Sequence, residues 1–146
     1  MFPDPKIPFE LDITIQPSDI DELGHVNNTV YLRWVQDAAV THWGHVARPH
    51  EFNSLFWVVM KHEIEYKRQT FLEDDVYART WIGGRQNRHF ERFTHILRRN
   101  DGKLLAKART LWVPISAETR KAVPLTDEQK ARYSVAPDQL HTLETY

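Results

Sequence analysis

Residues 19–46 read DIDELGHVNNTVYLRWVQDAAVTHWGHV, and in this stretch a polar segment passes directly into an apolar helical pattern. The apolar residues recur at steps of three and four, as on one face of a helix: Tyr31, Trp34, Val35, Ala38, Ala39, Trp43 and Val46. Asn27, Asn28 or Thr29 can cap the helix start by accepting backbone N–H groups. Pro49 stops the helix soon after Val46, because the residue before a proline avoids helical angles. The pattern predicts a helix of about 16–18 residues, roughly 25 Å long.

The residues on either side of this helix predict β-strands, because apolar and polar positions roughly alternate there. One strand is expected before the helix, at residues 9–16, and the strands expected after it cover residues 56–68, 75–83, 87–99 and 103–115. Gly83-Gly84 is expected to punctuate two of these strands. Asn100-Asp101-Gly102 is expected to form a hairpin turn, because Asp-Gly accepts the positive φ angles of such turns.

The order of these elements predicts the fold class. An apolar helix must bury its face, and only a sheet is available to receive it. We therefore expect an α+β protein, a single domain of residues 1–146 whose antiparallel sheet curls around one central helix, with its core within residues 9–115. A short helix capped by Thr126 should end near Tyr133, and the chain after Ser134 should be loosely held. The need to cover sheet edges favours a homodimer.

Composition and charge argue against several functional classes. The formal net charge is −1, so no basic excess indicates nucleic-acid binding. Cysteine is absent, which excludes disulfides and thiolate nucleophiles. The 8 histidines show no His-x-x-x-His-Glu pattern, so no metal site is expected. No apolar run approaches the ~20 residues that span a bilayer, and the start MFPDPKIPFELD lacks the core of a signal peptide. A soluble cytoplasmic protein without membrane insertion is expected.

Three segments together resemble the hotdog-fold thioesterases. They are the motif D-x-x-G-H-V-N-N-x-x-Y at residues 21–31, the segment IEYKR at residues 64–68, and Gly84 followed by Arg88-x-Phe90. The chain is most similar to the 4-hydroxybenzoyl-CoA thioesterase-like branch, which includes bacterial long-chain acyl-CoA thioesterases, and it is also similar to plant acyl-carrier-protein thioesterases. The resemblance implies a hotdog fold and hydrolysis of an acyl thioester without metal or prosthetic group. It also implies a homodimer or a tetramer of dimers, with the active site at the dimer interface.

The motif before the helix fits the chemistry of thioester hydrolysis. A thioester carbonyl needs an activated water or a nucleophile, and a site that stabilises the developing oxyanion. The first N–H groups of a helix are unpaired and carry partial positive charge, so they can supply that site. The resemblance places Asp21 at the catalytic acid position, as general base or nucleophile. Without the resemblance, the better interpretation of Asp21 is a loop acid that caps turns, and the resemblance reverses this preference; Asp19 is expected to be a solvated turn acid.

The neighbours of Asp21 have both functional and structural interpretations. His25 can polarise the carbonyl, position water or tune the aspartate, and a histidine near a helix start is often only a hydrogen-bonded structural group. Gly24 permits a close approach of substrate to the backbone. Asn27 is interpreted equally as a helix cap and as a site residue that fixes an imidazole nitrogen, whereas Asn28 is expected to be structural.

The sequence departs from the plant branch at two places. Leu23 stands where that branch has Asn, and Gln69-Thr70 stands where it has Glu and often Cys. A simpler aspartate mechanism, as in the bacterial branch, is therefore predicted. Glu63 and Glu65 are possible helpers, although charged strand residues are usually solvated or paired.

The expected substrate is an acyl-CoA. In the bacterial branch a basic residue at the position of Arg88 lies near the nucleotide phosphates, so Arg88 is expected to bind CoA phosphate, with a solvated turn residue as the alternative. Two other functions stay open. One is a hotdog hydratase or dehydratase, which typically uses Asp-x-Asn-Pro-x-His; here Leu23 replaces the Asn and there is no Pro. The other is a non-catalytic acyl-CoA binding module.

Overall fold

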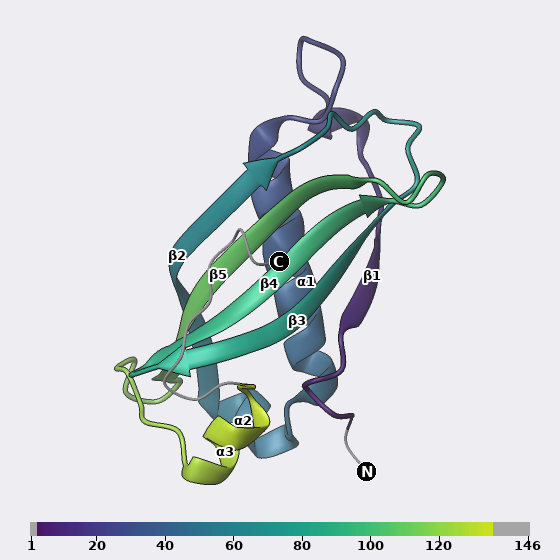
Figure 1. The fold of residues 1–146 in the computed structure, drawn as a ribbon. Coiled ribbons are helices and arrows are strands. Elements are labelled where there is room, and N and C mark those ends of the chain that lie inside the picture. Colours follow the sequence, from purple (N-terminus) through teal and green to yellow (C-terminus); the bar gives the residue numbers. More distant parts are fainter. Residues whose placement is uncertain (1–2, 136–146) are drawn as a thin grey trace.

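The predicted helix forms α1, Asn28–Val46, and lies against one face of a sheet in the computed structural model, which describes residues 3–135 (Figure 1). Asn27 caps it through its side chain, and the chain leaves helical angles at Ala47. The helix has 19 residues, slightly more than expected. The remaining elements are β1 Phe9–Ile13, the 3₁₀ turn η1 Pro17–Asp19, α2 Pro49–Ser54, β2 Leu55–Tyr66, β3 Val76–Gln86, β4 His89–Arg98, β5 Leu104–Ser116 and α3 Asp127–Arg132.

The five strands form one sheet in the order β1-β3-β4-β5-β2, and every neighbouring pair is antiparallel. The sheet curls around α1, so the apolar face of the helix meets the inner face of the sheet (Figure 1). The main core consists of buried residues from the loop before α1, α1 itself and the inner strands: Val26, Val30, Tyr31, Trp34, Ala38, Val76, Ala78, Ile96, Leu105 and Ala106. The predicted α+β architecture, an antiparallel sheet around a central helix, is confirmed.

Several predicted boundaries need correction. β1 ends at Ile13 rather than at residue 16, because Ile13 pairs with Val76, the first residue of β3, and residues 14–16 have no partner strand. Pro49 does end α1, but it also starts α2, since proline is favoured in the first turn of a helix. This short helix was not predicted. The hairpin turn at residues 100–102 is present, with Gly102 at φ 68°.

Gly83-Gly84 is not a boundary between strands. Both glycines lie inside β3, at an irregularity in its pairing with β4 between Ile82 and Arg85. A Cβ atom on Gly83 would lie 2.5 Å from Glu91 Oε1 and 2.7 Å from Phe93, so close packing rather than a turn requires glycine here. The turn between β3 and β4 follows at Asn87, which has φ 56°.

A second, smaller cluster of buried hydrophobic side chains lies at the end of the sheet near α2 and α3. It contains Val46, Leu55, Phe90, Leu125 and Tyr133. The expected helix after Thr126 is confirmed as α3, and Thr126 caps it by accepting from the Gln129 amide at 3.1 Å.

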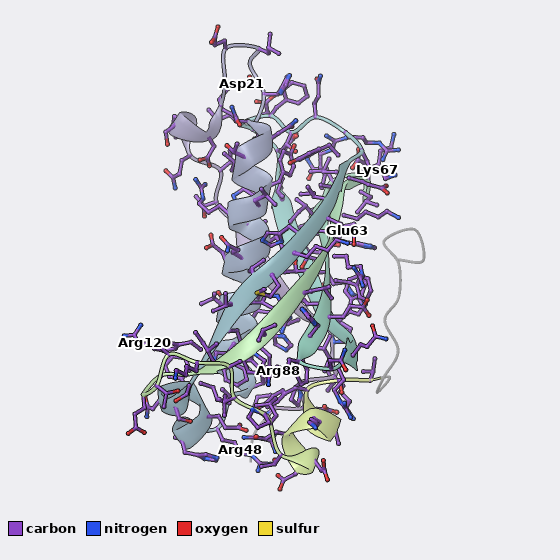
Figure 2. The ribbon with its side chains drawn as sticks, turned by 90° about the vertical axis from the view of Figure 1, so that its left-hand side faces the viewer. Asp21, Arg48, Glu63, Lys67, Arg88 and Arg120 are labelled. Carbon is purple, nitrogen blue, oxygen red and sulfur yellow. The ribbon has the colours of Figure 1, made fainter. Side chains whose placement is uncertain are left out.

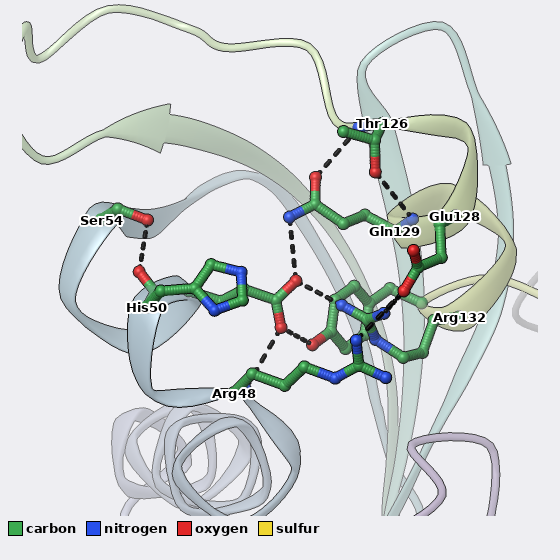
Figure 3. A network of polar contacts seen from close by, with 9 residues as sticks. Arg48, His50, Ser54, Thr126, Glu128, Gln129 and Arg132 are labelled. Atoms are coloured by element: carbon green, nitrogen blue, oxygen red, sulfur yellow. Dashed lines mark hydrogen bonds and ion pairs between the residues drawn. The ribbon is translucent and has the colours of Figure 1, made fainter.

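α2 and α3 are joined by one buried carboxylate (Figure 3). Glu51 of α2 has no exposed surface, and it accepts hydrogen bonds from Tyr133 Oη at 2.6 Å, from Gln129 Nε2 at 2.9 Å and from Arg132. Its other contact is the Arg48 amide, at 3.2 Å. The carboxylate therefore holds the two short helices together.

The C-terminal segment that was expected to be loosely held, from residue 136 onward, lies outside the described residues. A single domain over residues 1–146 therefore stays a prediction for the whole chain. None of the helices within residues 3–135 is long and apolar enough to cross a membrane.

Candidate active site

The motif before α1 folds into a small closed hairpin. Ile20 and Val26 form an antiparallel bridge, and the Asp21 amide donates to the His25 carbonyl at 2.9 Å. The tip turns at Gly24, which has φ 85° and whose amide donates to the Asp21 carbonyl at 3.0 Å. This loop projects from the end of the molecule where α1 begins, and it carries Asp21 outward (Figure 2).

Asp21 is half-buried, and its contacts are local. Its Oδ1 accepts from the Leu23 amide at 2.9 Å, which is the turn-capping contact that was the structural alternative for this residue. The second carboxylate oxygen makes no hydrogen bond within residues 3–135, so the side chain can still act on a substrate. A Cβ at position 24 would meet no atom within 4 Å, so close packing does not require glycine there. Glycine is favoured at this position because φ is positive. The predicted contact between Gly24 and substrate stays a prediction.

Asp19 is not the solvated turn acid that was expected. Its relative exposure is 2%, and its carboxylate accepts from Arg33 Nη2 at 2.8 Å and from the Gln16 amide at 2.9 Å. Its carbonyl oxygen accepts from the Asn27 amide at 2.9 Å. Asp19 therefore anchors the base of the hairpin to α1. These bonds engage both carboxylate oxygens, so Asp21 remains the candidate for chemistry.

Asn27 acts as the cap of α1. Its Oδ1 accepts from the Thr29 amide at 3.0 Å and from Thr29 Oγ1 at 2.8 Å, while its carbonyl accepts from the Val30 amide at 3.0 Å. The amides of Thr29 and Val30 are thus paired, whereas the amide of Asn28, the first residue of α1, has no acceptor within residues 3–135. This donor stands at the positive end of the helix, directly after the Asp21 hairpin.

His25 lies between the hairpin tip and the cap, and it is half-buried. Its imidazole makes no hydrogen bond within residues 3–135, and the Asn27 Oδ1 that was expected to fix it accepts from Thr29. The structure thus brings Asp21, His25 and the first amides of α1 into one segment. The catalytic roles of Asp21, His25 and Asn27 stay predictions.

The segment from Asp21 to the start of α1 is held in place by a buried pair of hydroxyl groups, those of Thr70 and Tyr31. Thr70 is fully buried, its carbonyl accepts from the Val26 amide at 2.8 Å, and its Oγ1 contacts Tyr31 Oη at 2.7 Å. Burial raises the pKa of Tyr31, so its hydroxyl stays protonated. Tyr66 Oη donates to the Asn28 carbonyl at 3.1 Å. Thr70 and Tyr66 were not predicted as supports, although Tyr31 belongs to the motif and Tyr66 to the IEYKR segment.

Replacing Thr70 with Val should lower the free energy of unfolding by about 1–3 kcal/mol, because the Tyr31 hydroxyl would lose its buried partner while side-chain volume is nearly kept. Urea unfolding followed by fluorescence measures the change. Thr14→Val, at an exposed position, is the matched control and should change stability by less than about 0.5 kcal/mol. Equal midpoints for the two variants would contradict the support role of Thr70.

The two strand acids considered as helpers are paired. Glu63 accepts from Arg109 Nη1 at 2.6 Å and lies 3.4 Å from Lys61 Nζ, and Glu65 lies 2.7 Å from Lys67 Nζ. The paired interpretation of these residues is the one that the structure shows.

Arg88 does not join the Asp21 segment within one chain. It is exposed in the turn between β3 and β4, and Figure 2 shows Arg88 and Asp21 toward opposite ends of the molecule. Its predicted contact with CoA phosphate stays a prediction, and it requires an interface between two chains. Within residues 3–135, no group of three or more His, Cys, Asp or Glu side chains is arranged to hold a metal ion.

Comparison with known proteins shows which family this architecture represents. The profile of the Thioesterase-like superfamily matches residues 15–133, which is most of the chain. The chain belongs to this thioesterase-like superfamily. The resemblance to hotdog thioesterases inferred from the motifs is thereby confirmed.

Curated relatives of this superfamily member include two plant enzymes. The chain is 28% identical over 122 residues to a chloroplast acyl-[acyl-carrier-protein] hydrolase of Cuphea viscosissima, covering 84% of this chain and 27% of that protein. It is 27% identical over 122 residues to the chloroplast palmitoyl-acyl carrier protein thioesterase of Cuphea hookeriana, with the same 84% and 27% coverage. The chain thus spans about a quarter of the length of these relatives.

Solved structures confirm the hotdog fold of this superfamily member. A thioesterase from Thermus thermophilus, complexed with coenzyme A and Zn, matches with a TM-score of 0.73 and 23% identity, covering 85% of this chain and 95% of that chain. The 1,4-dihydroxy-2-naphthoyl-CoA thioesterase of Synechocystis matches with a TM-score of 0.71 and 18% identity, covering 86% and 95%.

Proposed function

We propose that the protein hydrolyses acyl-CoA to the free acid and CoA, with Asp21 as general base or nucleophile. One observation carries this proposal: a closed hairpin holds Asp21 directly before the start of α1, where the Asn28 amide has no acceptor within residues 3–135. A carboxylate and an unpaired amide donor are the two groups that thioester hydrolysis needs. Membership of the thioesterase-like superfamily supports the same reaction class.

The proposed reaction has two steps. Asp21 either takes a proton from water, which then attacks the thioester carbonyl carbon, or attacks that carbon itself to give an anhydride that water opens. The carbonyl oxygen becomes negative and is stabilised by the Asn28 amide at the start of α1, with His25 as an additional donor. In either route the C–S bond of the resulting adduct breaks and the thiolate leaves and takes up a proton; in the nucleophilic route this step forms the anhydride, which water opens afterwards. The free acid and the CoA thiol are the products.

The proposed site also includes a second copy of the chain. Arg88, which we propose contacts the CoA phosphates, lies far from Asp21 of the same chain (Figure 2). A homodimer, or a tetramer of dimers, could supply this residue across an interface. β2 is an edge strand with exposed apolar side chains at Phe56, Val58 and Met60, and such an edge is a surface that proteins usually cover.

The experiment is a thiol-release assay over short, long and aromatic acyl-CoAs, with acyl-carrier-protein thioesters as a second substrate set. The chain has no cysteine, so a thiol reagent reports only released CoA or carrier protein. We expect saturable release from at least one acyl-CoA. Tight binding without release would instead support an acyl-CoA binding module, hydration of an enoyl-CoA would support a hydratase, and release only from carrier-protein substrates would refute the CoA preference.

A further inference from the structure

A cavity of about 380 Å³ lies beside the C-terminal half of α1 and is also lined by residues of α2 and β2. Its wall is largely aromatic and includes Trp43, Phe52, Phe56, Trp57, Phe90 and Trp112. The volume falls in the range of about 300–1,000 Å³ that is usual for small-molecule pockets. None of the residues in the proposed Asp21 site lines it.

One cation in the cavity wall has no acidic partner. Arg92 of β4 lines the cavity, and its Nη1 bonds His42 Nδ1 at 2.9 Å and Thr80 Oγ1 at 3.1 Å. Both partners are neutral acceptors, and no carboxylate within residues 3–135 pairs with this guanidinium. Glu91 also lines the cavity, but Arg109 Nε at 2.7 Å and the Gly84 amide at 3.1 Å already engage it.

The charge states at neutral pH follow from burial. Burial lowers the pKa of Arg92 to about 10, so the guanidinium still carries its charge. Burial, together with the charge of Arg92, lowers the pKa of His42 to about 3, so this imidazole is neutral. His42 is also fixed by stacking on Phe9, with ring centroids 5.1 Å apart. The cavity therefore carries one uncompensated positive charge.

A ligand that enters the cavity meets the Arg92 charge and the aromatic wall together. A charge removed from water without a counter-ion is costly, and a ligand that brings an anion offsets this cost. The aromatic wall in turn favours an apolar ligand body.

We propose that this cavity binds a monocarboxylate with an apolar body, whose carboxylate pairs with Arg92 and whose body lies against the aromatic wall. The inference rests on the cavity, its unpaired cation and its aromatic wall, and it does not depend on the proposed function. The free acid released from an acyl thioester belongs to the same chemical class, and so does any fatty or aromatic acid that the protein meets.

Titration calorimetry with matched ligand pairs tests the proposal. Octanoate is compared with 1-octanol, and benzoate with benzyl alcohol, so that alkyl and aryl bodies are each tested with and without an anion. We expect at least one carboxylate to bind at least tenfold more tightly than its alcohol. Equal affinities within both pairs, or no binding of either acid, would overturn the proposal, whether or not the protein hydrolyses thioesters.

Arg92→Met tests the residue itself. It should weaken carboxylate binding at least tenfold and leave alcohol binding unchanged, because only the ion pair is lost. The matched control is Arg79→Met, an exposed arginine on the neighbouring strand β3, which should bind like the unmodified protein. Unchanged carboxylate binding in Arg92→Met would refute this assignment. The comparison of acid with alcohol in the unmodified protein decides the proposal even if Arg92→Met does not fold.

Discussion

Asp21→Asn should lower kcat for thioester hydrolysis by about 10²–10⁴-fold, while the temperature of unfolding stays unchanged. The loss follows because an amide can neither take a proton from water nor attack the carbonyl carbon. The stability of the fold should not change, since within residues 3–135 the Asp21 side chain accepts only from the Leu23 amide, and the Asn side-chain oxygen can accept the same bond. Steady-state kinetics and a thermal melt measure the two quantities.

Glu22→Gln is the matched control for this prediction. Glu22 is exposed in the same hairpin and carries the same charge, but it precedes the unmatched Leu23 rather than opening the motif. We expect its kcat to stay within about twofold of the unmodified protein, because surface changes away from special contacts have small effects. Full activity in Asp21→Asn would exclude the proposed mechanism and would leave the hotdog fold untouched.

Glu51→Ala should lower the free energy of unfolding by about 3–5 kcal/mol. The change leaves the Tyr133 hydroxyl without its acceptor, and it removes the buried one of the two carboxylates that pair with Arg132 (Figure 3). Urea unfolding measures it. Glu128→Ala is the control: Glu128 pairs with the same Arg132, but its side chain is 72% exposed, so we expect a loss of less than about 1 kcal/mol. Similar losses in both variants would contradict a special role for the buried site.

The same carboxylate should make stability depend on pH in the acid range. Burial alone would raise the pKa of Glu51, but hydrogen bonds from Tyr133, Gln129 and the Arg48 amide, with the Arg132 charge, lower it below the ordinary value of 4.5. A lowered folded-state pKa contributes stability that is present above pH 4.5 and is lost as pH falls through the folded pKa. Glu51→Gln should therefore show a weaker loss of stability below pH 4.5 than the unmodified protein.

The parts of the fold that depend on neighbouring residues were predictable. The spacing of apolar side chains, the cap at Asn27 and the stop at Pro49 define α1, and each signal lies within one helix. The hairpin turn at Gly102 follows from two adjacent residues in the same way. The sequence motif also placed Asp21 and His25 before a helix start, which is where the structure has them.

The errors arose where distant residues decide the conformation. Gly83 resembles a turn signal, but the reason for the glycine is Glu91 on the opposite strand. Asp19 resembles a surface acid, but Arg33 reaches it from the second turn of α1. Glu51 gave no signal, since its side-chain partners follow it by 78 to 82 residues. Contacts between residues far apart in the sequence form only when the elements pack together, so the pattern of neighbouring residues does not predict them.

Hydrogen bonds close the base of the hairpin that carries Asp21, at the point where the hairpin projects from the rest of the protein. Ile20 bridges Val26, and the Asn27 amide bonds the Asp19 carbonyl at 2.9 Å, so the two ends of the segment are fixed relative to each other. Changes in the length or composition of a surface loop with fixed ends reach the core only weakly. Residues 21–25 can therefore be exchanged as a cassette between relatives, and new chemistry could evolve there without any redesign of the sheet.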